Sequence, residues 1–267
     1  MKPSVLITGA SSGIGASAAE RLSEHGFRVF GTSRHPAAHA AGAPHVEWIE
    51  LDVHDDASVA KGVAQASAAA GSLDGLVCNA GYGIFGSVEE VTLEAARAQF
   101  ETNFFGVLRC LRAALPSMRQ AGRGRIVLVG SLAGRAPIPF QAHHSATKAA
   151  VESLALALRN ELHPTGVKVV LIEPGDIDTG FNDGMDWGDP GASAYAERAR
   201  AAERVIRESL PKAPGPEVVA RAIHQALCAK RPRVRYTMGA EAALTPIGKR
   251  WFPDGLFLRL IRTHYDV

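Results

Sequence analysis

The stretch Val5-Leu-Ile-Thr-Gly-Ala-Ser-Ser-Gly-Ile-Gly15 indicates a buried strand that turns sharply into a helix. Its first three residues form a continuous apolar run, which is typical of a parallel strand covered on both faces. A helical pattern follows over residues 16–24 and stops at Gly26. The glycines allow a tight turn and let backbone amides at a helix N-terminus approach a phosphate. Their G-x-x-x-G-x-G spacing is weak evidence alone, and it gains weight from its position directly after the first strand.

The rest of the chain repeats this alternation of strands and helices. The residue patterns predict strands at 5–7, 27–33, 46–53, 73–78, 125–131, 167–172 and 234–237. They predict helices at 16–24, 56–70, 93–120, 149–162 and 217–230, the third of them kinked or broken near Pro116. Such alternation favours an α/β fold with a doubly wound parallel sheet, Rossmann-like, of about seven strands with helices on both faces.

The length favours one domain over residues 1–267, because neither an internal repeat nor a linker composition is present. Residues 34–44 form an expected loop. Residues 176–214 are too long for a plain connection, and we expect a substrate loop there. Residues 240–267 form a C-terminal tail with several aromatic and leucine side chains.

Composition excludes several classes of protein. A net charge of +2 is too small to favour a nucleic acid or a membrane surface as partner. The three cysteines are widely spaced and fit neither a disulfide framework nor a zinc site, so we expect no metal. The N-terminus lacks the apolar core of a signal peptide, and no apolar run is long enough to span a bilayer. We expect a soluble cytoplasmic protein.

A candidate site involves the predicted strand that ends at Ser131 and the helix that follows it. Lys148 comes four residues after His144, so on a helix both side chains project from one face, one turn apart. Ligands of open α/β sheets bind at the carboxyl ends of the strands, where Ser131 is expected. These three side chains are therefore candidates for one site.

Taken together, the motifs resemble those of the short-chain dehydrogenases/reductases. In order they are Thr8-Gly-x-x-x-Gly-Ile-Gly15, Asp52-Val53, Asn79-Ala-Gly81, Asn103, Ser131, Lys148 and Pro174-Gly175. The match runs from about residue 4 to residue 180, and the joint pattern is highly specific. The segment 231–236 also resembles the hydroxysteroid- and retinol-dehydrogenase-like branch, more weakly. The resemblance implies binding of NAD or NADP and transfer of hydride between nicotinamide and a carbonyl or alcohol carbon.

The resemblance also assigns roles to individual residues. Ser131 would hydrogen-bond the substrate oxygen, Lys148 would hold the nicotinamide ribose, and Asn103 would support a water molecule next to that lysine. Asn103, Ser131, His144 and Lys148 are then the catalytic candidates. The cofactor-binding candidates are Gly9, Ser11, Ser12, Gly13, Ile14, Gly15, Arg34, Asp52, Val53, Asn79, Ala80, Gly81, Lys148, Pro174, Gly175, Ile177 and Thr179.

Arg34 follows the second predicted strand, where an aspartate would accept the ribose hydroxyls and repel a 2′-phosphate. A guanidinium instead offers a bidentate fork to that phosphate. NADP is the predicted cofactor, although a solvated loop arginine is the alternative interpretation.

The departure from the family pattern is at His144, where the family places the tyrosine that protonates the carbonyl oxygen. Three interpretations stay open: a working enzyme with histidine for tyrosine, a non-redox or inactive descendant that still binds cofactor, and an introduced substitution. Imidazole is shorter than phenol, which leaves space that a water could bridge. A neighbouring ammonium and a helix N-terminus favour the neutral ring, which suits a base or an electrophile better than a strong acid.

The sequence thus predicts an NADP-dependent oxidoreductase acting on a bulky lipophilic ketone or alcohol. Phe140, Phe181, Met185 and Trp187 come from segments expected around the cleft and favour such a substrate. The alternative is an NADP-binding isomerase, cyclase or dehydratase. By resemblance, the helices that carry Asn103 and Lys148 would pair in a homodimer or homotetramer.

Overall fold

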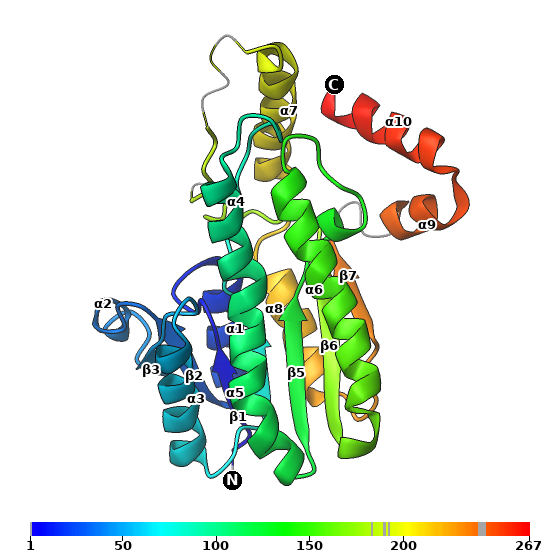
Figure 1. The fold of residues 1–267 in the computed structure, drawn as a ribbon. Helices are drawn as coiled ribbons and strands as arrows, with labels where there is room; N and C mark the ends of the chain where they lie inside the picture. Colours follow the sequence, from blue (N-terminus) through cyan, green and yellow to red (C-terminus); the bar gives the residue numbers. More distant parts are fainter. Residues whose placement is uncertain (1, 183, 189–190, 192, 240–243) are drawn as a thin grey trace.

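A seven-stranded, all-parallel sheet forms the centre of the protein, with strand order β3-β2-β1-β4-β5-β6-β7 (Figure 1). The computed structural model describes residues 2–182, 184–188, 191, 193–239 and 244–267. The chain leaves β1 toward β3 and returns across β1 to begin the other half at β4, which is the doubly wound topology that the sequence predicts. The strands are β1 (Ser4–Ile7), β2 (Arg28–Ser33), β3 (Val46–Glu50), β4 (Gly75–Cys78), β5 (Gly124–Val129), β6 (Val167–Pro174) and β7 (Arg235–Met238).

Helices cover both faces of this sheet. The α-helices are α1 (Gly13–Glu24), α2 (Ala37–Ala40), α3 (Asp56–Ala70), α4 (Leu93–Phe100), α5 (Gly106–Gln120), α6 (Ala142–Glu161), α7 (Ala196–Ser209), α8 (Glu217–Cys228), α9 (Leu244–Trp251) and α10 (Asp254–Tyr265). Shorter turns are the π-helical η1 (Glu101–Phe105) and the 3₁₀ turns η2 (Leu132–Gly134), η3 (His163–Thr165) and η4 (Leu210–Lys212).

Two apolar cores arise because successive strand residues point to opposite faces of the sheet. In β4 and β5, for example, Leu76 and Leu128 face the core under α3, α5 and α6, and Val77 and Val127 face the core under α1 and α8. All four side chains are fully buried. A strand buried on both faces therefore reads as an unbroken apolar run, as observed.

The predicted break near Pro116 is wrong in its position. Helix α5 continues through Pro116, and the irregular turn lies earlier, at η1, which contains Asn103. The predicted loop after Arg34 contains the short helix α2, and α6 begins at Ala142 rather than at residue 149. The earlier start places His144 and Lys148 in the first two turns of α6.

The segments after β6, together with Phe85 from the segment after β4, build a separate apolar layer above the sheet. We call it the apolar cap, formed by Phe85, Met185, Ala199, Ala202 and Ile206. Tyr265 and Val267 from the end of the chain pack against it, so α10 lies next to α7. The start of the predicted C-terminal tail, residues 240–243, lies outside the described residues.

Among the described residues, no helix combines the length and the apolar character needed to cross a bilayer. Nor do three His, Cys, Asp or Glu side chains in that part of the chain group around a possible metal position.

Candidate active site

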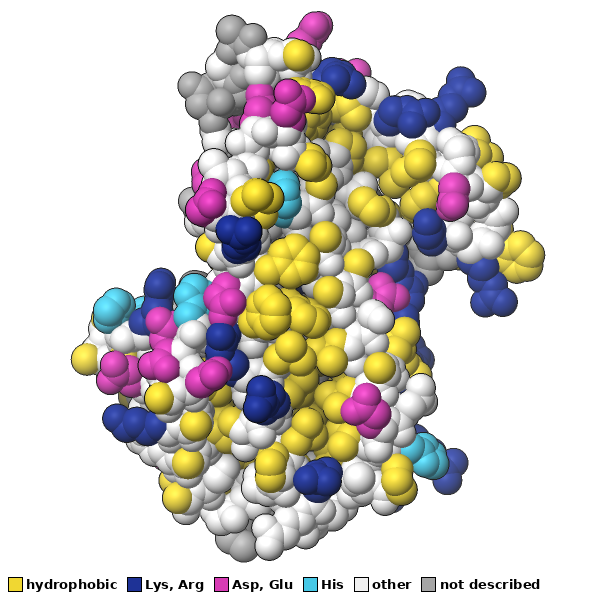
Figure 2. Space-filling model, viewed as in Figure 1, with side chains coloured by type: hydrophobic (Ala, Val, Ile, Leu, Met, Phe, Trp, Pro, Cys, Tyr) yellow, Lys and Arg dark blue, Asp and Glu magenta, His cyan; other side chains and the backbone are white. Residues whose placement is uncertain are grey.

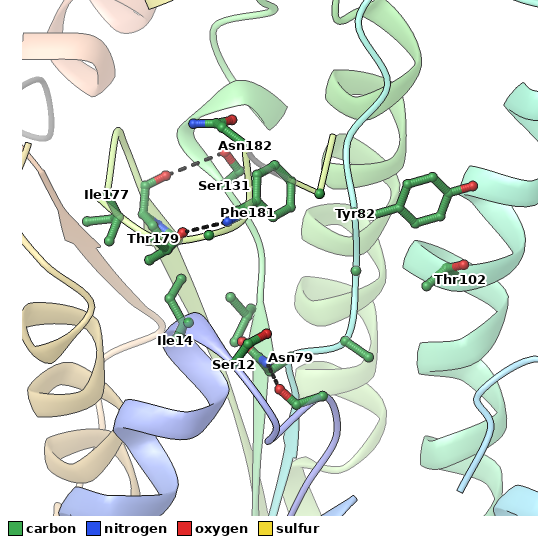
Figure 3. Close-up of a pocket in the computed structure, with 18 of the residues that line it drawn as sticks. Ser12, Ile14, Asn79, Tyr82, Thr102, Ser131, Ile177, Thr179, Phe181 and Asn182 are labelled. Atoms are coloured by element: carbon green, nitrogen blue, oxygen red, sulfur yellow. Dashed lines mark hydrogen bonds between the residues drawn. The ribbon is translucent and has the colours of Figure 1, made fainter. Parts of the chain in front are cut away.

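A cavity of about 840 Å³ opens at the carboxyl ends of the strands. Residues that follow β1, β2, β3, β4, β5 and β6 line it, together with the start of α6 and segments after β6 (Figure 3). This is the edge of the sheet at which the chain crosses from one half to the other, and ligands of open α/β sheets bind there.

Nearly all residues predicted for the site meet in this cavity. The lining includes Gly9, Ser11, Ser12, Gly13, Ile14, Arg34, Asp52, Val53, Asn79, Ala80, Gly81, Ser131, His144, Lys148, Pro174, Gly175, Ile177 and Thr179. Gly15 and Asn103 do not line it, and both lie directly behind residues that do.

The glycine turn is shaped by backbone geometry. Gly9 and Gly13 have φ values of +64° and +51°, in the left-handed region that favours glycine. A Cβ on Gly15 would lie 2.1 Å from the carbonyl oxygen of Gly9. Only glycine therefore lets the start of α1 pack this closely under the turn. Ser12, the residue before α1, makes no side-chain capping hydrogen bond, and it lines the cavity together with Gly13 and Ile14.

Side-chain hydrogen bonds across the switch between β1 and β4 hold the turn in place. The Oγ1 atom of Thr8 accepts from the amides of Asn79 (3.0 Å) and Ala80 (3.1 Å). In return, Nδ2 of Asn79 donates to the carbonyl oxygens of Thr8 and Gly9, both at 3.1 Å. Asn79 is thus a structural clamp on the glycine turn as well as a lining residue.

Ser131 and Lys148 are brought together by close packing of η2 on α6. A Cβ on Gly134 would lie 3.0 Å from the backbone of Lys148 and Ala149, so glycine permits this approach. The Oγ atom of Ser131 accepts from the amide of Ala133 at 3.1 Å and donates to the carbonyl oxygen of Pro174 at 3.4 Å. Ser131 therefore sits at a fixed position between the ends of β5 and β6.

Lys148 is buried, and its Nζ donates to the carbonyl oxygen of Val129 at 3.0 Å. Burial lowers the pKa of Lys148 to about 8, because the charged form loses its hydration. The lysine therefore exchanges its proton close to neutral pH.

His144 lies deep in the cavity wall and is only 5% exposed. Its ring meets the ring of Phe181 edge to face at 5.6 Å, and its Nδ1 has no hydrogen-bond partner among the described residues. Burial lowers the pKa of His144 to about 3; Lys148 adds to this effect and a backbone hydrogen bond with Tyr82 opposes it. The imidazole is consequently neutral over the usual working range of pH.

Asn103 sits in the wide π-helical turn η1 and connects three elements. Its Oδ1 accepts from the amide of Tyr82 at 3.0 Å, and its Nδ2 donates to the carbonyl oxygen of Tyr82 (3.0 Å) and to Oγ1 of Thr147 (3.2 Å). Thr147 in turn donates to the carbonyl oxygen of His144 at 2.8 Å. The side chain of Asn103 is therefore committed to positioning the loop after β4 against α6; support of a water molecule beside Lys148 stays a prediction.

Sequence reasoning missed several lining residues, including Tyr82 and Tyr265. Tyr82 directly follows the Asn79-Ala-Gly81 motif, so this neighbouring position in the sequence could have predicted that it lines the cavity. Figure 3 shows its ring pointing away from Ser131 and Phe181. Tyr265 comes from the last turn of α10, and no local sequence pattern predicts that it lines the cavity.

The aromatic residues predicted around the cleft divide into two groups. Phe181 lines the cavity, as expected. Phe140, Met185 and Trp187 do not: Met185 is part of the apolar cap, and the other two pack against it. Aromatic side chains bury large apolar areas, which explains this alternative location.

Comparison with known proteins gives consistent results. The 3-ketodihydrosphingosine reductase of Bacteroides thetaiotaomicron is 37% identical over 271 residues, which cover 100% of this chain and 100% of the relative. The crystal structure of a short-chain dehydrogenase from Streptomyces avermitilis superposes with a TM-score of 0.85 at 34% identity, covering 100% of this chain and 97% of that one. A closed serine dehydrogenase in complex with NADP⁺ superposes with a TM-score of 0.78 at 27% identity, covering 88% and 94%.

The family description "short chain dehydrogenase" matches residues 3–187, which include the glycine turn, the clamp at Asn79 and the Ser131/His144/Lys148 group. With more than half of the chain inside this match, the protein belongs to the short-chain dehydrogenase family of oxidoreductases.

Proposed function

We propose that this protein is an NADP(H)-dependent oxidoreductase that interconverts a bulky lipophilic ketone and its alcohol. Ser131, His144 and Lys148 are its catalytic residues, and Asn103 positions them. The observation that carries the proposal is that these three side chains line the same cavity as the glycine turn.

The cavity fits a dinucleotide. Gly15 lets the start of α1 pack directly under the glycine turn, and the N-terminus of this twelve-residue helix supplies amides and a partial positive charge for a pyrophosphate. Ser11 and Ser12 add hydroxyl groups to the lining, and Asp52, which by resemblance to the family would contact the adenine, lines the same cavity. The bound cofactor supplies or accepts the hydride.

The preference for NADP rests on Arg34, which is exposed at the end of β2 and lines the cavity. None of the ion pairs among the described residues involves its guanidinium, so this group can bind a phosphate. The related serine dehydrogenase that was solved with NADP⁺ supports this assignment.

The preference for a lipophilic substrate rests on the wall opposite the glycine turn. Ile138, Phe181, Ile206 and Leu210 line the cavity there, and three of these four belong to residues 176–214. We therefore propose that 176–214 is a substrate loop within a single domain. The relative named 3-ketodihydrosphingosine reductase supports a ketone as the reacting group.

Reduction of a ketone requires a hydride at carbon and a proton at oxygen. In this proposal Ser131 donates a hydrogen bond to the substrate oxygen. His144, as a neutral imidazole, donates a second hydrogen bond to the carbonyl oxygen and so polarises the carbonyl. The neutral histidine of triosephosphate isomerase has the same role toward its own substrate. As the hydride reaches the carbon, the substrate oxygen takes up a proton. Lys148 is the group with a pKa near neutrality, so it supplies that proton through a water molecule in the space beside the imidazole, or through His144, whose ring gives its N–H proton to the oxygen and takes one from Lys148.

The pH dependence of the reaction tests these roles. Because His144 is already neutral above about pH 3, acidification from pH 7 to pH 5 leaves its protonation unchanged. The rate of reduction instead declines as pH rises through about 8, where Lys148 loses its proton. The measurement is kcat/KM against pH for the parent, His144→Tyr and His144→Phe with one lipophilic ketone and deuterium-labelled NADPH.

In this measurement we expect His144→Tyr to raise the rate by up to about 10²–10⁴-fold, the usual contribution of a general acid, if the cavity admits the larger ring. His144→Phe should be slower than the parent. Identical rates and profiles for all three proteins would exclude a role of His144 in polarising the substrate. Binding of NADPH without transfer of the label in any of the three would favour isomerisation, cyclisation or dehydration instead.

We further propose that the faces of α5 and α6 pair across a two-fold axis in a homodimer or homotetramer. Figure 2 shows hydrophobic side chains gathered over these helices, and Phe105, the last residue of η1 directly before α5, is 45% exposed. Light scattering that detects only monomer at micromolar concentration would contradict this assembly.

A further inference from the structure

The helices α9 and α10 carry several large apolar side chains that are exposed to solvent. Trp251 is 72% exposed, and Ile247, Leu256, Leu258 and Leu260 are each more than 40% exposed. These account for half of the ten large hydrophobic side chains that are exposed in the described residues. Figure 2 shows α9 and α10 as a lobe at the side of the molecule on which apolar and basic side chains alternate.

The same two helices concentrate positive charge. They carry Lys249, Arg250, Arg259 and Arg262, and the only ion pair of these four in the described residues joins Lys249 to Asp254 at 3.3 Å. The other acidic residue nearby, Asp266, pairs with Arg204 at 3.2 Å. Three arginines are thus left facing solvent, although the whole chain has a net charge of only +2. A small average charge does not exclude a local basic surface.

The two sides of α10 have different surroundings. Phe257, Ile261 and Tyr265 recur every four residues, are the less exposed residues of the helix, and face the protein. Tyr265 also lines the cavity. Leu256 and Leu260, one turn apart, lie on another face with Arg259 between them in sequence. Helix α10 therefore borders the cavity on one side and solvent on the other.

We propose that the basic-apolar face, formed by Ile247, Arg250, Trp251, Leu256, Arg259, Leu260 and Arg262, docks on the surface of an anionic lipid bilayer. Exposed Trp and Leu side chains among arginines are the composition of helices that lie in the membrane interface. The arginines can extend their guanidinium groups to lipid phosphates while the aliphatic stems stay near the apolar layer.

A second copy of this chain fits the same face less well. A symmetric pairing of two such faces would bring their unpaired arginines together, and like charges across an interface oppose association. A bilayer of negative lipids instead matches the sign of every free charge on the face. Docking would hold the cavity about one helix diameter, roughly 10 Å, from the lipid surface, because α10 separates the two.

The test is co-sedimentation of the full-length protein with vesicles of phosphatidylcholine alone and of phosphatidylcholine with 30 mol% phosphatidylglycerol. We expect binding to the anionic vesicles, weakening with added salt, and little binding to the neutral ones. Replacing Arg250, Arg259 and Arg262 by glutamine should lower the partition coefficient by about fivefold for each charge, or about 100-fold together. Trp251→Ser with Leu256→Ser and Leu260→Ser should lower it by about tenfold or more.

Matched controls remove the same groups elsewhere on the surface. Arg221, Arg231 and Arg233 are exposed on α8 and in the segment before β7, and Val88 and Leu93 are both 68% exposed. Glutamine at the three arginines, or serine at the two apolar positions, should leave vesicle binding within about twofold of the parent. Thermal unfolding and NADPH binding of every variant establish that its fold is kept.

Equal binding to neutral and anionic vesicles, no binding to either, or equal losses in the control and test variants would overturn the proposal. So would light scattering in which the parent forms a larger assembly than the serine triple variant while neither protein binds vesicles, because the face would then join two copies. None of these results depends on turnover, so failure of the docking proposal is distinguishable from failure of the proposed reaction.

Discussion

The glycine turn after β1 and helix α10 both border the cavity, yet different kinds of contact hold them in place. The turn is fixed by backbone geometry: Gly9 and Gly13 have positive φ, Gly15 has no room for a Cβ, and Asn79 clamps the carbonyl groups. Helix α10 is held by apolar contacts of Phe257, Tyr265 and Val267 and by a surface ion pair. The comparison indicates that the first region tolerates very little change and the second a great deal. Pairs of matched substitutions can test that difference.

The largest difference is expected for glycine to alanine. Gly15→Ala places a Cβ 2.1 Å from the oxygen of Gly9 and should lower the free energy of unfolding by roughly 4 kcal/mol or more. Gly255→Ala in α10 meets open space and an ordinary helical φ, so it should be neutral or stabilise by about 0.4–1 kcal/mol. Urea denaturation of the two variants measures both values. Similar losses at the two positions would break the comparison.

Ion pairs should show the next largest difference. Glu173 is 1% exposed and contacts Arg235 at 2.5 Å and Arg135 at 3.1 Å; burial raises its pKa although both guanidinium groups oppose that shift. Glu173→Gln leaves Arg135 and Arg235, which are half-buried, with Glu152 as their remaining acidic partner, and should cost about 3 kcal/mol of stability. Asp266→Asn removes an exposed partner of Arg204 and should cost about 1 kcal/mol or less. The same denaturation experiment compares them, and a loss at Asp266 as large as that at Glu173 would show that α10 depends on its ion pair.

A third experiment measures how the free energy of unfolding changes with acidification when His144, in the cavity wall, is present or replaced. The pKa of His144 is lowered to about 3 in the folded protein, against about 6.5 when unfolded. Between these values the unfolded chain binds the additional proton, so the contribution of His144 to stability is complete above pH 6.5 and is lost as the pH falls toward 3. Between pH 6.5 and pH 4 the parent should lose about 3 kcal/mol more than His144→Phe.

The control for that experiment is His163→Gln, at an exposed position in η3. This variant should lose as much stability on acidification as the parent. If His144→Phe behaved in the same way, the imidazole would be hydrated in solution, and the proposal of a permanently neutral ring would fail.

The smallest effect concerns Arg34, an exposed residue at the edge of the first region. If Arg34 binds the 2′-phosphate, Arg34→Ala should reduce the preference for NADP over NAD by about tenfold, or about 1.4 kcal/mol, and leave the affinity for NAD nearly unchanged. Titration of both cofactors by protein fluorescence measures the two affinities. An unchanged ratio would assign cofactor selection to other residues near the end of β2.

The glycine turn and the sheet around it could be predicted from the sequence because short runs of residues determine their backbone conformation. Residue patterns predicted all seven strands within a few residues, and the order of motifs along the chain predicted the cavity that Ser131, His144 and Lys148 line. Parallel strands buried on both faces leave little choice of register or direction.

The position of α10, and the residues around the cavity that lie outside the motifs, could not be predicted from the sequence in this way. Phe140 and Trp187 resemble Phe181 in character, and only the three-dimensional path of the loop decides which of them reaches the cavity. Likewise, the position of Tyr265 depends on a contact between α10 and α7, whose residues are far apart in sequence. The irregular turn at η1 escaped because a proline is a stronger local signal than the hydrogen bonds that Asn103 makes with Tyr82.

The clamp between Thr8 and Asn79 also bears on the order in which the protein can be assembled during synthesis. The residues that it joins are about 70 positions apart, and β1 pairs with β4 only after two other strands have been made. A growing chain that has emerged as far as β3 thus carries every glycine of the turn but lacks the partner that fixes their carbonyl groups. Closing so long a loop costs conformational entropy before the clamp repays it. The nucleotide cannot, on this account, act as an early template for folding of the nascent chain; it becomes a stabilising ligand only once the fourth strand has joined the first.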